Sequence, residues 1–186
     1  MKKFLALALC IAILLAGCMG SLNVKNRSGD ELVTALAVTL SDFDSLSPEE
    51  KTAYTAACLD LEIMNGGLCQ FFANCPDCAA FVPEALDRLG AAEHKALYEQ
   101  FLADYAIDPL DPMFQTESIE EFSQLYDLYP WDDFDDAYCA LTPMSELLEA
   151  YIQANPDAFG QIPPTRCPTQ RAFFDQNRCA RGFSAV

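Results

Sequence analysis

The chain has 186 residues, and its 28 aspartates and glutamates outnumber its 11 lysines and arginines, for a formal net charge of −17 at pH 7. This excess of acids argues against direct binding of nucleic acid, because phosphates attract basic surfaces. Residues 96–165 alone contain fifteen acids and no lysine or arginine, whereas a typical surface mixes both signs. Such a one-signed field attracts cations, so the expected partner is a basic protein.

The N-terminal segment 1–17 has the three parts of a secretory signal: a basic start, an apolar run and small residues at its end. The sequence L-A-G-C that ends at Cys18 resembles a bacterial lipobox, in which Cys18 carries acyl chains such as palmitate and becomes the mature N-terminus. An ordinary signal peptide with an incidental Cys18 is the alternative. We therefore expect an exported lipoprotein, anchored to the cell membrane through Cys18, with residues 18–29 as a tether.

After the tether, the spacing of apolar residues predicts helices almost throughout, with no alternating strand pattern of useful length. A capping box at Ser47 and Glu50, with Pro48 in the first turn, starts one helix, and a box at Ser118 and Glu121 starts another. The predicted helices cover residues 30–39, 48–64, 68–73, 83–89, 91–105, 118–129, 132–141 and 143–154. The chain is therefore predicted to be all-α, with a single compact domain of about seven or eight helices over residues 30–160.

Burial within these helices can also be predicted. The helix over 48–64 should bury a stripe of four side chains, which are Tyr54, Cys58, Leu61 and Met64. Trp131 is expected in the core. His94 is the only histidine, and it is expected on the surface among charged neighbours.

The C-terminal segment 161–186 differs from the body, because its four arginines face one aspartate and make it net +3. Cys167 and Cys179 bracket much of this basic tail and could close a disulfide loop. The tail is expected either to fold back onto the acidic body or to move freely.

The most specific local string is E-I-M-N-G-G-L-C-Q-F-F-A-N at residues 62–74. It predicts a helix stop, a sharp turn and a restart, because asparagine and glycine tolerate the left-handed C-cap. Its polar side chains can satisfy backbone groups that such a turn would otherwise leave unpaired. We therefore interpret the string as structural, and its defining residues are Glu62, Asn65, Gly66, Gly67, Gln70, Phe71, Phe72 and Asn74.

These eight residues resemble the signature of the DNA-mimic protein family, which looks like E-x-x-N-G-G-F-x-Q-[FY]-F-x-N, with Leu68 where phenylalanine is usual. The resemblance implies an all-helical, non-enzymatic and often dimeric domain, so a homodimer is a second expected partner. It also implies carboxylates that imitate DNA phosphates toward a protein that binds DNA. The densest carboxylates, which would then bind the partner, are Glu117, Glu120, Glu121, Asp132, Asp133, Asp135 and Asp136.

Cys75 and Cys78 have the spacing of a redox pair or of half a zinc site. A structural disulfide between them, within a loop, is favoured, because a redox pair would need a strand–helix context and zinc would need further ligands such as Cys69 or His94. A cysteine-based redox or metal-binding protein is the alternative function, and an acidic surface protein without a specific ligand is a third. The sequence has no nucleophile elbow, phosphate-binding glycine loop or HExxH string. We therefore expect no catalytic residue, no cofactor and no metal.

Overall fold

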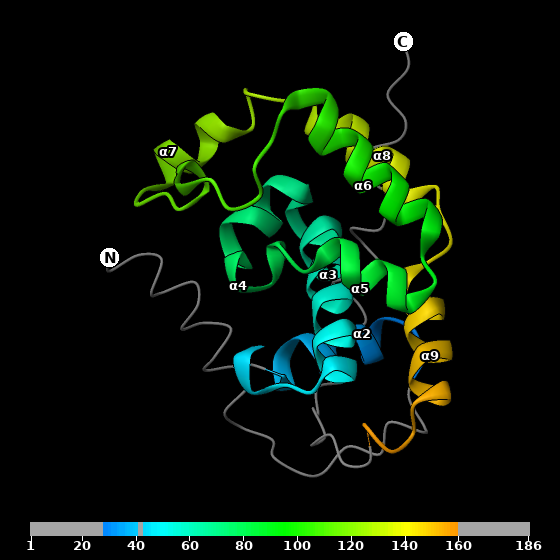
Figure 1. Ribbon diagram of the computed structural model, residues 1–186. Helices are drawn as coiled ribbons and strands as arrows, with labels where there is room; N and C mark the ends of the chain where they lie inside the picture. The colour runs from blue at the N-terminus through cyan, green and yellow to red at the C-terminus, as the bar shows by residue number, and fades with distance from the viewer. Residues whose placement is uncertain (1–27, 41–42, 160–186) are drawn as a thin grey trace.

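The computed structural model describes residues 28–40 and 43–159 of the chain (Figure 1). The predicted signal segment, Cys18 and the basic tail with Cys167 and Cys179 lie outside these residues. Eight α-helices and no strand are present in the described part of the chain, so the all-α prediction is confirmed. The helices are α2 (Asp30–Thr39), α3 (Pro48–Asn74), α4 (Pro76–Ala79), α5 (Val82–Leu89), α6 (Ala92–Tyr105), α7 (Ile119–Leu125), α8 (Trp131–Cys139) and α9 (Met144–Ala154), with 3-10 turns η2 (Phe43–Ser45) and η3 (Pro112–Phe114).

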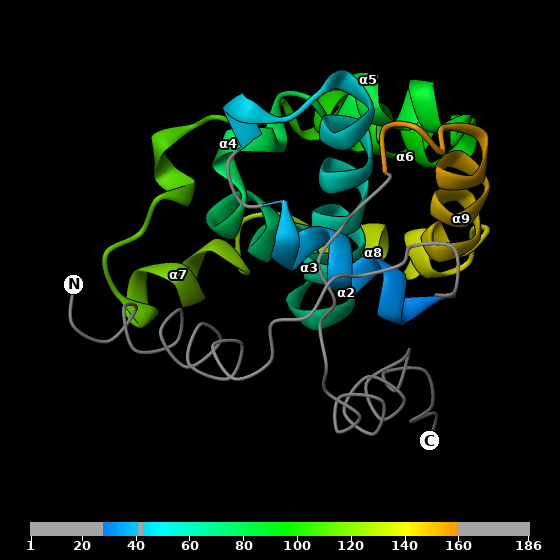
Figure 2. The ribbon, with the colours of Figure 1, turned by 90° about the horizontal axis from the view of Figure 1, so that it is seen from below.

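Helix α3 lies at the centre of the bundle, and α2, α5, α8 and α9 pack around it (Figures 1 and 2). It starts with the predicted capping box. The Glu50 N–H donates to Ser47 Oγ at 3.2 Å, and the Ser47 N–H donates to Glu50 Oε2 at 2.9 Å. Reciprocal bonds of this kind satisfy backbone donors that the first helical turn leaves without partners, which fixes where α3 begins.

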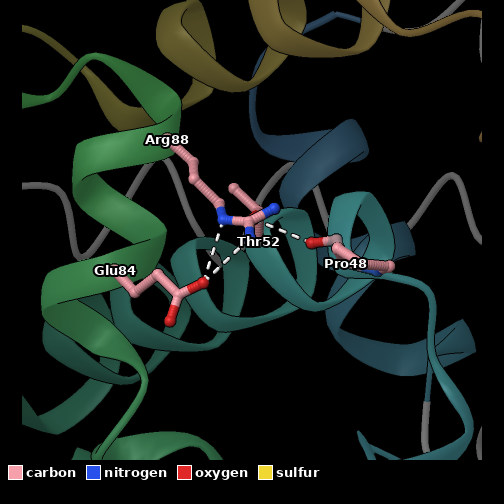
Figure 3. Close-up of polar contacts among 4 residues, drawn as sticks. All are labelled: Pro48, Thr52, Glu84 and Arg88. Carbon is pink, nitrogen blue, oxygen red and sulfur yellow. Dashed lines mark hydrogen bonds and ion pairs between the residues drawn. The ribbon is translucent and has the colours of Figure 1, made fainter.

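Two further polar contacts lie at the start of α3 and on α5 (Figure 3). The Thr52 hydroxyl donates to the Pro48 carbonyl oxygen at 2.9 Å, so this buried polar side chain is satisfied within its own helix. On α5, Arg88 Nη2 lies 2.9 Å from Glu84 Oε1. That pair is solvent-exposed and joins neighbouring turns of one helix, so it contributes little to stability.

An aromatic cluster fills the core between α3, α6 and α8. The Phe72 ring centroid lies 5.0 Å from that of Phe114, 6.1 Å from Trp131 and 6.3 Å from Tyr98. Trp131 is 2 % exposed, and its Nε1–H donates to the Leu125 carbonyl oxygen at 2.8 Å. Its predicted place in the core is therefore confirmed, with the indole N–H satisfied as buried tryptophan requires.

The prediction of a surface histidine is wrong. His94 is 3 % exposed, and its ring packs edge-on against Tyr138 with centroids 5.2 Å apart. Burial lowers the pKa of His94 and outweighs the opposing hydrogen bond to the Thr142 backbone and the charge of Glu93. His94 is therefore a core residue between α6 and α8.

The buried face of α3 also differs from the predicted stripe. Of its four predicted side chains only Cys58 is buried, whereas Tyr54, Leu61 and Met64 are half-buried. The buried face instead includes many small side chains, among them Ala53, Ala56 and Ala57. A single stripe is the pattern of a helix that packs on one side, and α3 has neighbours on several sides.

Most of the predicted boundaries are confirmed to within a few residues. Helix α3 loses helical geometry at Gly66 and Gly67, where the stop and restart were predicted. Helix α7 ends at Leu125 rather than near Tyr129, and a short helix, α4, forms at 76–79 where a loop was predicted. Within the described ranges, every helix is too short or too polar to cross a membrane.

Candidate functional site

The bend in α3 needs glycine for two separate reasons. Gly67 has φ 87° and ψ 175°, a backbone conformation that side chains with a Cβ rarely adopt. A Cβ at Gly67 would also overlap the carboxylate of Asp135 on α8. At Gly66, whose φ of −157° any residue can adopt, a Cβ would overlap the side chain of Gln70. Both glycines therefore make room for polar side chains that approach the bend.

Glu62 joins the two parts of the bent helix. Its Oε2 accepts hydrogen bonds from Gln70 Nε2 at 2.7 Å and from Asn74 Nδ2 at 2.8 Å. Partial burial raises the pKa of the Glu62 carboxyl, while the two amide donors act in the opposite direction. One carboxylate before the bend thus holds two amides after it.

Two side chains from outside α3 form hydrogen bonds with the backbone at the bend. Asp135 Oδ1 accepts a hydrogen bond from the Leu68 N–H at 2.9 Å, so it caps the restarted part of α3 in the way an N-cap aspartate does. The Tyr126 hydroxyl, just after α7, donates to the Gly66 carbonyl oxygen at 2.7 Å. These bonds satisfy backbone groups that the broken helix leaves without intrahelical partners.

The 62–74 string therefore has a clear structural task in this fold. Phe71 and Phe72 are fully buried, and the side chains of Gln70 and Asn74 both bond to that of Glu62. Asn65 is exposed. The bonds to backbone groups that were expected from the string's own polar side chains come instead from Asp135 and Tyr126.

Helix α8 presents three of the predicted partner-binding carboxylates on one face. Trp131, Phe134 and Tyr138 are buried at helical spacing, so the opposite face must be solvated. That solvated face carries the exposed residues Asp132, Asp133 and Asp136. Asp135, between them, points to the bend instead. The structure thus separates one member of the predicted aspartate cluster from the other three.

The predicted glutamates lie around the start of α7. Glu117 and Glu120 are exposed. Glu121 is also exposed, but its Oε2 accepts the Glu117 N–H at 2.9 Å, and its own N–H donates to Ser118 Oγ at 3.1 Å. The second capping box is therefore shifted by one residue, because Glu121 reaches Glu117 rather than Ser118. Glu121 has a local structural role beside its charge.

Residues 106–130, which connect α6 to α8 and are called the arm below, expose apolar side chains among these acids. Helix α7 lies apart from the other helices in both views (Figures 1 and 2). Ile119 is 62 % exposed and Leu128 is 50 % exposed, with Leu110 and Tyr126 also exposed. All the exposed large apolar residues of the described chain lie within 105–128. The sequence pattern did not single out these residues, because their exposure depends on how the arm lies relative to the other helices.

The basic residues lie elsewhere. Of the described residues only Lys51, Arg88 and Lys95 are basic. Arg88 pairs with Glu84 at 2.9 Å, and Lys95 Nζ lies 3.0 Å from Asp87 Oδ1. Both of these ion pairs lie on α5 and α6, outside the arm and α8.

A family model described as DMP19-like protein matches residues 44–155 of the chain. The chain belongs to the DMP19-like family. DMP19 is a family of DNA mimics, and the matched range contains the bend, the arm and α8. Searches of curated proteins and of solved structures gave no match.

The DMP19-like domain also contains a group of thiols. Cys75 lies between α3 and α4, and Cys78 lies within α4. Both are free thiols here, and Cys78 is buried. The sequence suggested Cys69 or His94 as additional ligands for this pair, and within the described residues no group of three or more cysteine, histidine or acidic side chains is placed to hold a metal ion.

Proposed function

We propose that this DMP19-like domain is a non-enzymatic binding module that presents carboxylates to a basic protein partner. The proposal is supported most directly by the exposure of Asp132, Asp133 and Asp136 on one face of α8, within a stretch that has no lysine or arginine. Phosphate contacts supply most of the sequence-independent affinity of DNA-binding proteins. Carboxylates on a helical surface can therefore compete for the same basic residues.

The arm adds a second kind of contact to this surface. Exposed apolar side chains surrounded by polar residues are typical of protein interaction sites, and buried apolar anchors supply much of the affinity of such interfaces. Ile119 and Leu128 have this character, and Glu117 and Glu120 lie close to Ile119 in the sequence. The partner thus fits a description: a basic surface that binds phosphate and has apolar side chains at its edge.

The proposal includes an exported, lipid-anchored form. The expected acylation of Cys18 would hold the domain at a membrane by residues 18–29. The partner would then be a basic protein on the same side of that membrane. Self-association into a homodimer is part of the proposal, and the mass of the purified domain in solution tests it.

Competition with DNA tests the binding proposal. The probe is a purified helix–turn–helix DNA-binding domain loaded with fluorescent duplex DNA, and the protein is added at increasing salt. We expect release of the DNA at low salt and a steep loss of this competition as salt rises, because exposed charges are screened. Poly-L-lysine serves as a second probe that has positive charge without a DNA-binding shape.

Matched variants separate a specific surface from net charge. Asp132→Asn, Asp133→Asn and Asp136→Asn together remove three exposed charges from α8. The control removes three exposed charges from elsewhere, with Asp44→Asn, Asp77→Asn and Asp157→Asn. The proposal requires a larger loss of competition from the α8 set. Equal losses, or binding of poly-L-lysine alone, would instead indicate an acidic surface without a specific ligand.

A further inference from the structure

Helix α7 carries an apolar face that the rest of the domain leaves partly open. Ile119, Phe122 and Tyr126 follow one another at spacings of three and four residues, so they lie on one side of the helix and its C-cap. Ile119 is 62 % exposed and Tyr126 is 38 % exposed, while Phe122 is half-buried. The rings of Phe122 and Tyr126 meet edge to face, with centroids 5.3 Å apart. These three residues are termed the α7 face below.

Hydrogen bonds hold the α7 face in place at both of its ends. The Ser118 Oγ accepts the Glu121 N–H at 3.1 Å and caps the start of α7. At the other end, the Tyr126 hydroxyl donates to the Gly66 carbonyl oxygen at 2.7 Å. A surface that is already ordered loses little conformational entropy when a ligand covers it. The α7 face is therefore suited to a ligand with apolar side chains.

Acidic side chains lie beside both ends of the α7 face. Glu120 directly follows Ile119, Asp127 directly follows Tyr126, and both acids are exposed. The lysines and arginines of the described chain all lie outside the arm. A ligand that complements this surface must therefore bring apolar side chains and positive charge together.

The chain itself contains a segment of this composition. Residues 161–186 include four arginines and a single aspartate. Phe173 and Phe174 lie between Arg171 and Arg178 in this basic tail. The tail thus offers aromatic side chains with positive charge on both sides, as the α7 face offers apolar side chains with negative charge on both sides.

We propose that the basic tail, residues 161–186, is an intramolecular ligand of the α7 face and inhibits partner binding. Phe173 and Phe174 cover the apolar side chains, and the flanking arginines lie beside the acids. The inhibitory role rests on the proposed function, in which the arm contacts a basic partner. The tail and the partner then share the arm, so the tail must leave before the partner binds.

The tail is long enough to reach α7 from the end of the described chain. Helices α7 and α9 lie on opposite sides of the domain in both views (Figures 1 and 2). Phe159 follows α9, and its ring centroid lies 6.3 Å from that of Tyr151. From Phe159 to Phe173 the chain can span about 45 Å when extended. A domain of about 130 residues has a radius of gyration of about 14 Å and is therefore about 36 Å across, so the phenylalanines can reach the α7 face.

Attachment to the same chain makes even a weak contact effective. A tethered ligand has an effective concentration on the order of 1 mM. With a dissociation constant of about 0.5 mM, the tail then covers the α7 face in about two thirds of the molecules. The apparent affinity for the partner falls by about threefold, because only the uncovered molecules are competent to bind it.

Photo-cross-linking of the full chain tests the contact without any partner. Phe173→p-benzoylphenylalanine places a photoreactive aromatic group in the tail, and the irradiated protein is cut at acidic residues and mapped by mass spectrometry. We expect a cross-link within one chain to a peptide of the arm, with a yield that does not depend on protein concentration. A cross-link between chains would make a second copy the occupant. That outcome, a cross-link to another surface, or the absence of any cross-link would overturn the proposal.

Matched charge variants test the acids beside the α7 face. Glu120→Gln with Asp127→Asn should lower the yield of the cross-link by about twofold, because each exposed ion pair contributes modestly. The control, Asp44→Asn with Asp77→Asn, removes the same charge at exposed positions elsewhere and should leave the yield unchanged. Equal losses would show that the acidic domain attracts the tail without a defined site, which contradicts the proposal.

Competition with DNA for the helix–turn–helix probe measures the inhibitory role. Phe173→Ser with Phe174→Ser, in the full chain, should compete about threefold better than the wild-type chain. Phe183→Ser, which lies outside the segment between the two arginines, should compete as the wild-type chain does. Unchanged competition in the double variant, despite a cross-link to the arm, would overturn the inhibitory role.

The two assays separate this inference from the proposed function. If the cross-link to the arm forms but neither the wild-type chain nor the double variant competes with DNA, the proposed function fails and the docking of the tail stands. If the wild-type chain competes with DNA and the cross-link is absent, the proposed function stands and the docking of the tail is wrong.

Discussion

The bend in α3 and the arm are both unusual in sequence, but they differ in what their side chains do. At the bend, polar side chains make internal hydrogen bonds: Glu62 accepts from two side-chain amides, and Asp135 caps the restarted helix. In the arm, acids and large apolar residues such as Ile119 and Leu128 face solvent. The distinctive string thus builds the scaffold, and the less distinctive arm supplies the exposed surface.

Substitutions in these two regions should therefore have different effects. A glycine or carboxylate at the bend is fixed by the geometry of its neighbours, so substitution should change stability. An acid or apolar residue on the arm has few internal contacts, so substitution should leave the fold intact and change binding. The largest changes in stability are therefore expected at the bend, and the smallest on the arm.

Gly67→Ala should have the largest effect. The new methyl group would be strained at φ 87° and would displace the Asp135 carboxylate from the Leu68 N–H, so we expect a loss of about 3 kcal/mol in the free energy of unfolding. Gly90→Ala is the control, because Gly90 has φ 76° but open space around it. Its expected loss is about 1 kcal/mol. Equal losses in urea denaturation would show that the carboxylate contact contributes nothing.

Asp135→Ala and Asp136→Ala form an adjacent matched pair on α8. Asp135 accepts the Leu68 N–H, and removal of a charged acceptor from a partly buried donor should lower the free energy of unfolding by about 2 kcal/mol. Asp136 is exposed, so its substitution should change stability by less than about 0.5 kcal/mol. The gain in helix propensity is common to both variants and cancels in the comparison. If Asp136→Ala is as destabilising, the capping role of Asp135 is wrong.

Local sequence signals were sufficient for the scaffold. Ser47 and Glu50 bond to each other within one helical turn, and consecutive glycines favour a turn whatever lies around them, so the start and the bend of α3 were predicted from the sequence. Side chains whose environment depends on distant elements were not predicted correctly. His94 is buried because α8 packs against α6, and no local pattern contains that information.

The candidate surface was predictable only in part, for the same reason. The acids of α8 could be counted from the sequence, but the separation of Asp135 from Asp136 required the position of Leu68. Exposure of Ile119 depends on α7 lying apart from the bundle. Tertiary placement, rather than residue type, decides each of these roles.

His94 predicts a pH dependence that belongs to the scaffold and not to the arm. Burial lowers its pKa in the folded state, and its Nε2 has no hydrogen-bond partner among the described residues. The unfolded chain therefore takes up the proton first as pH falls. The stability that neutral His94 allows is present above the unfolded pKa of about 6.5 and is lost as pH drops below it.

Denaturation midpoints between about pH 7 and pH 5 measure this effect, since carboxylates titrate mostly below that window. His94→Phe keeps a ring beside Tyr138 and should flatten the decline in stability across the window. A variant with the same slope as the wild-type chain would assign the acid sensitivity to another group.

The arm should show the smallest change in stability and a clear change in binding. Ile119→Ser and Leu128→Ser replace side chains that are already exposed, so each should alter the free energy of unfolding by less than about 0.5 kcal/mol. If these residues anchor a partner, their combined loss should weaken competition with DNA for the helix–turn–helix probe by about tenfold or more. Gln153→Ser, at an exposed position on α9, should change neither quantity. If the arm variant competes as well as the wild-type chain while the α8 variant does not, the binding surface is confined to the carboxylates of α8. If the arm variant instead loses much of its stability, the arm is part of the scaffold.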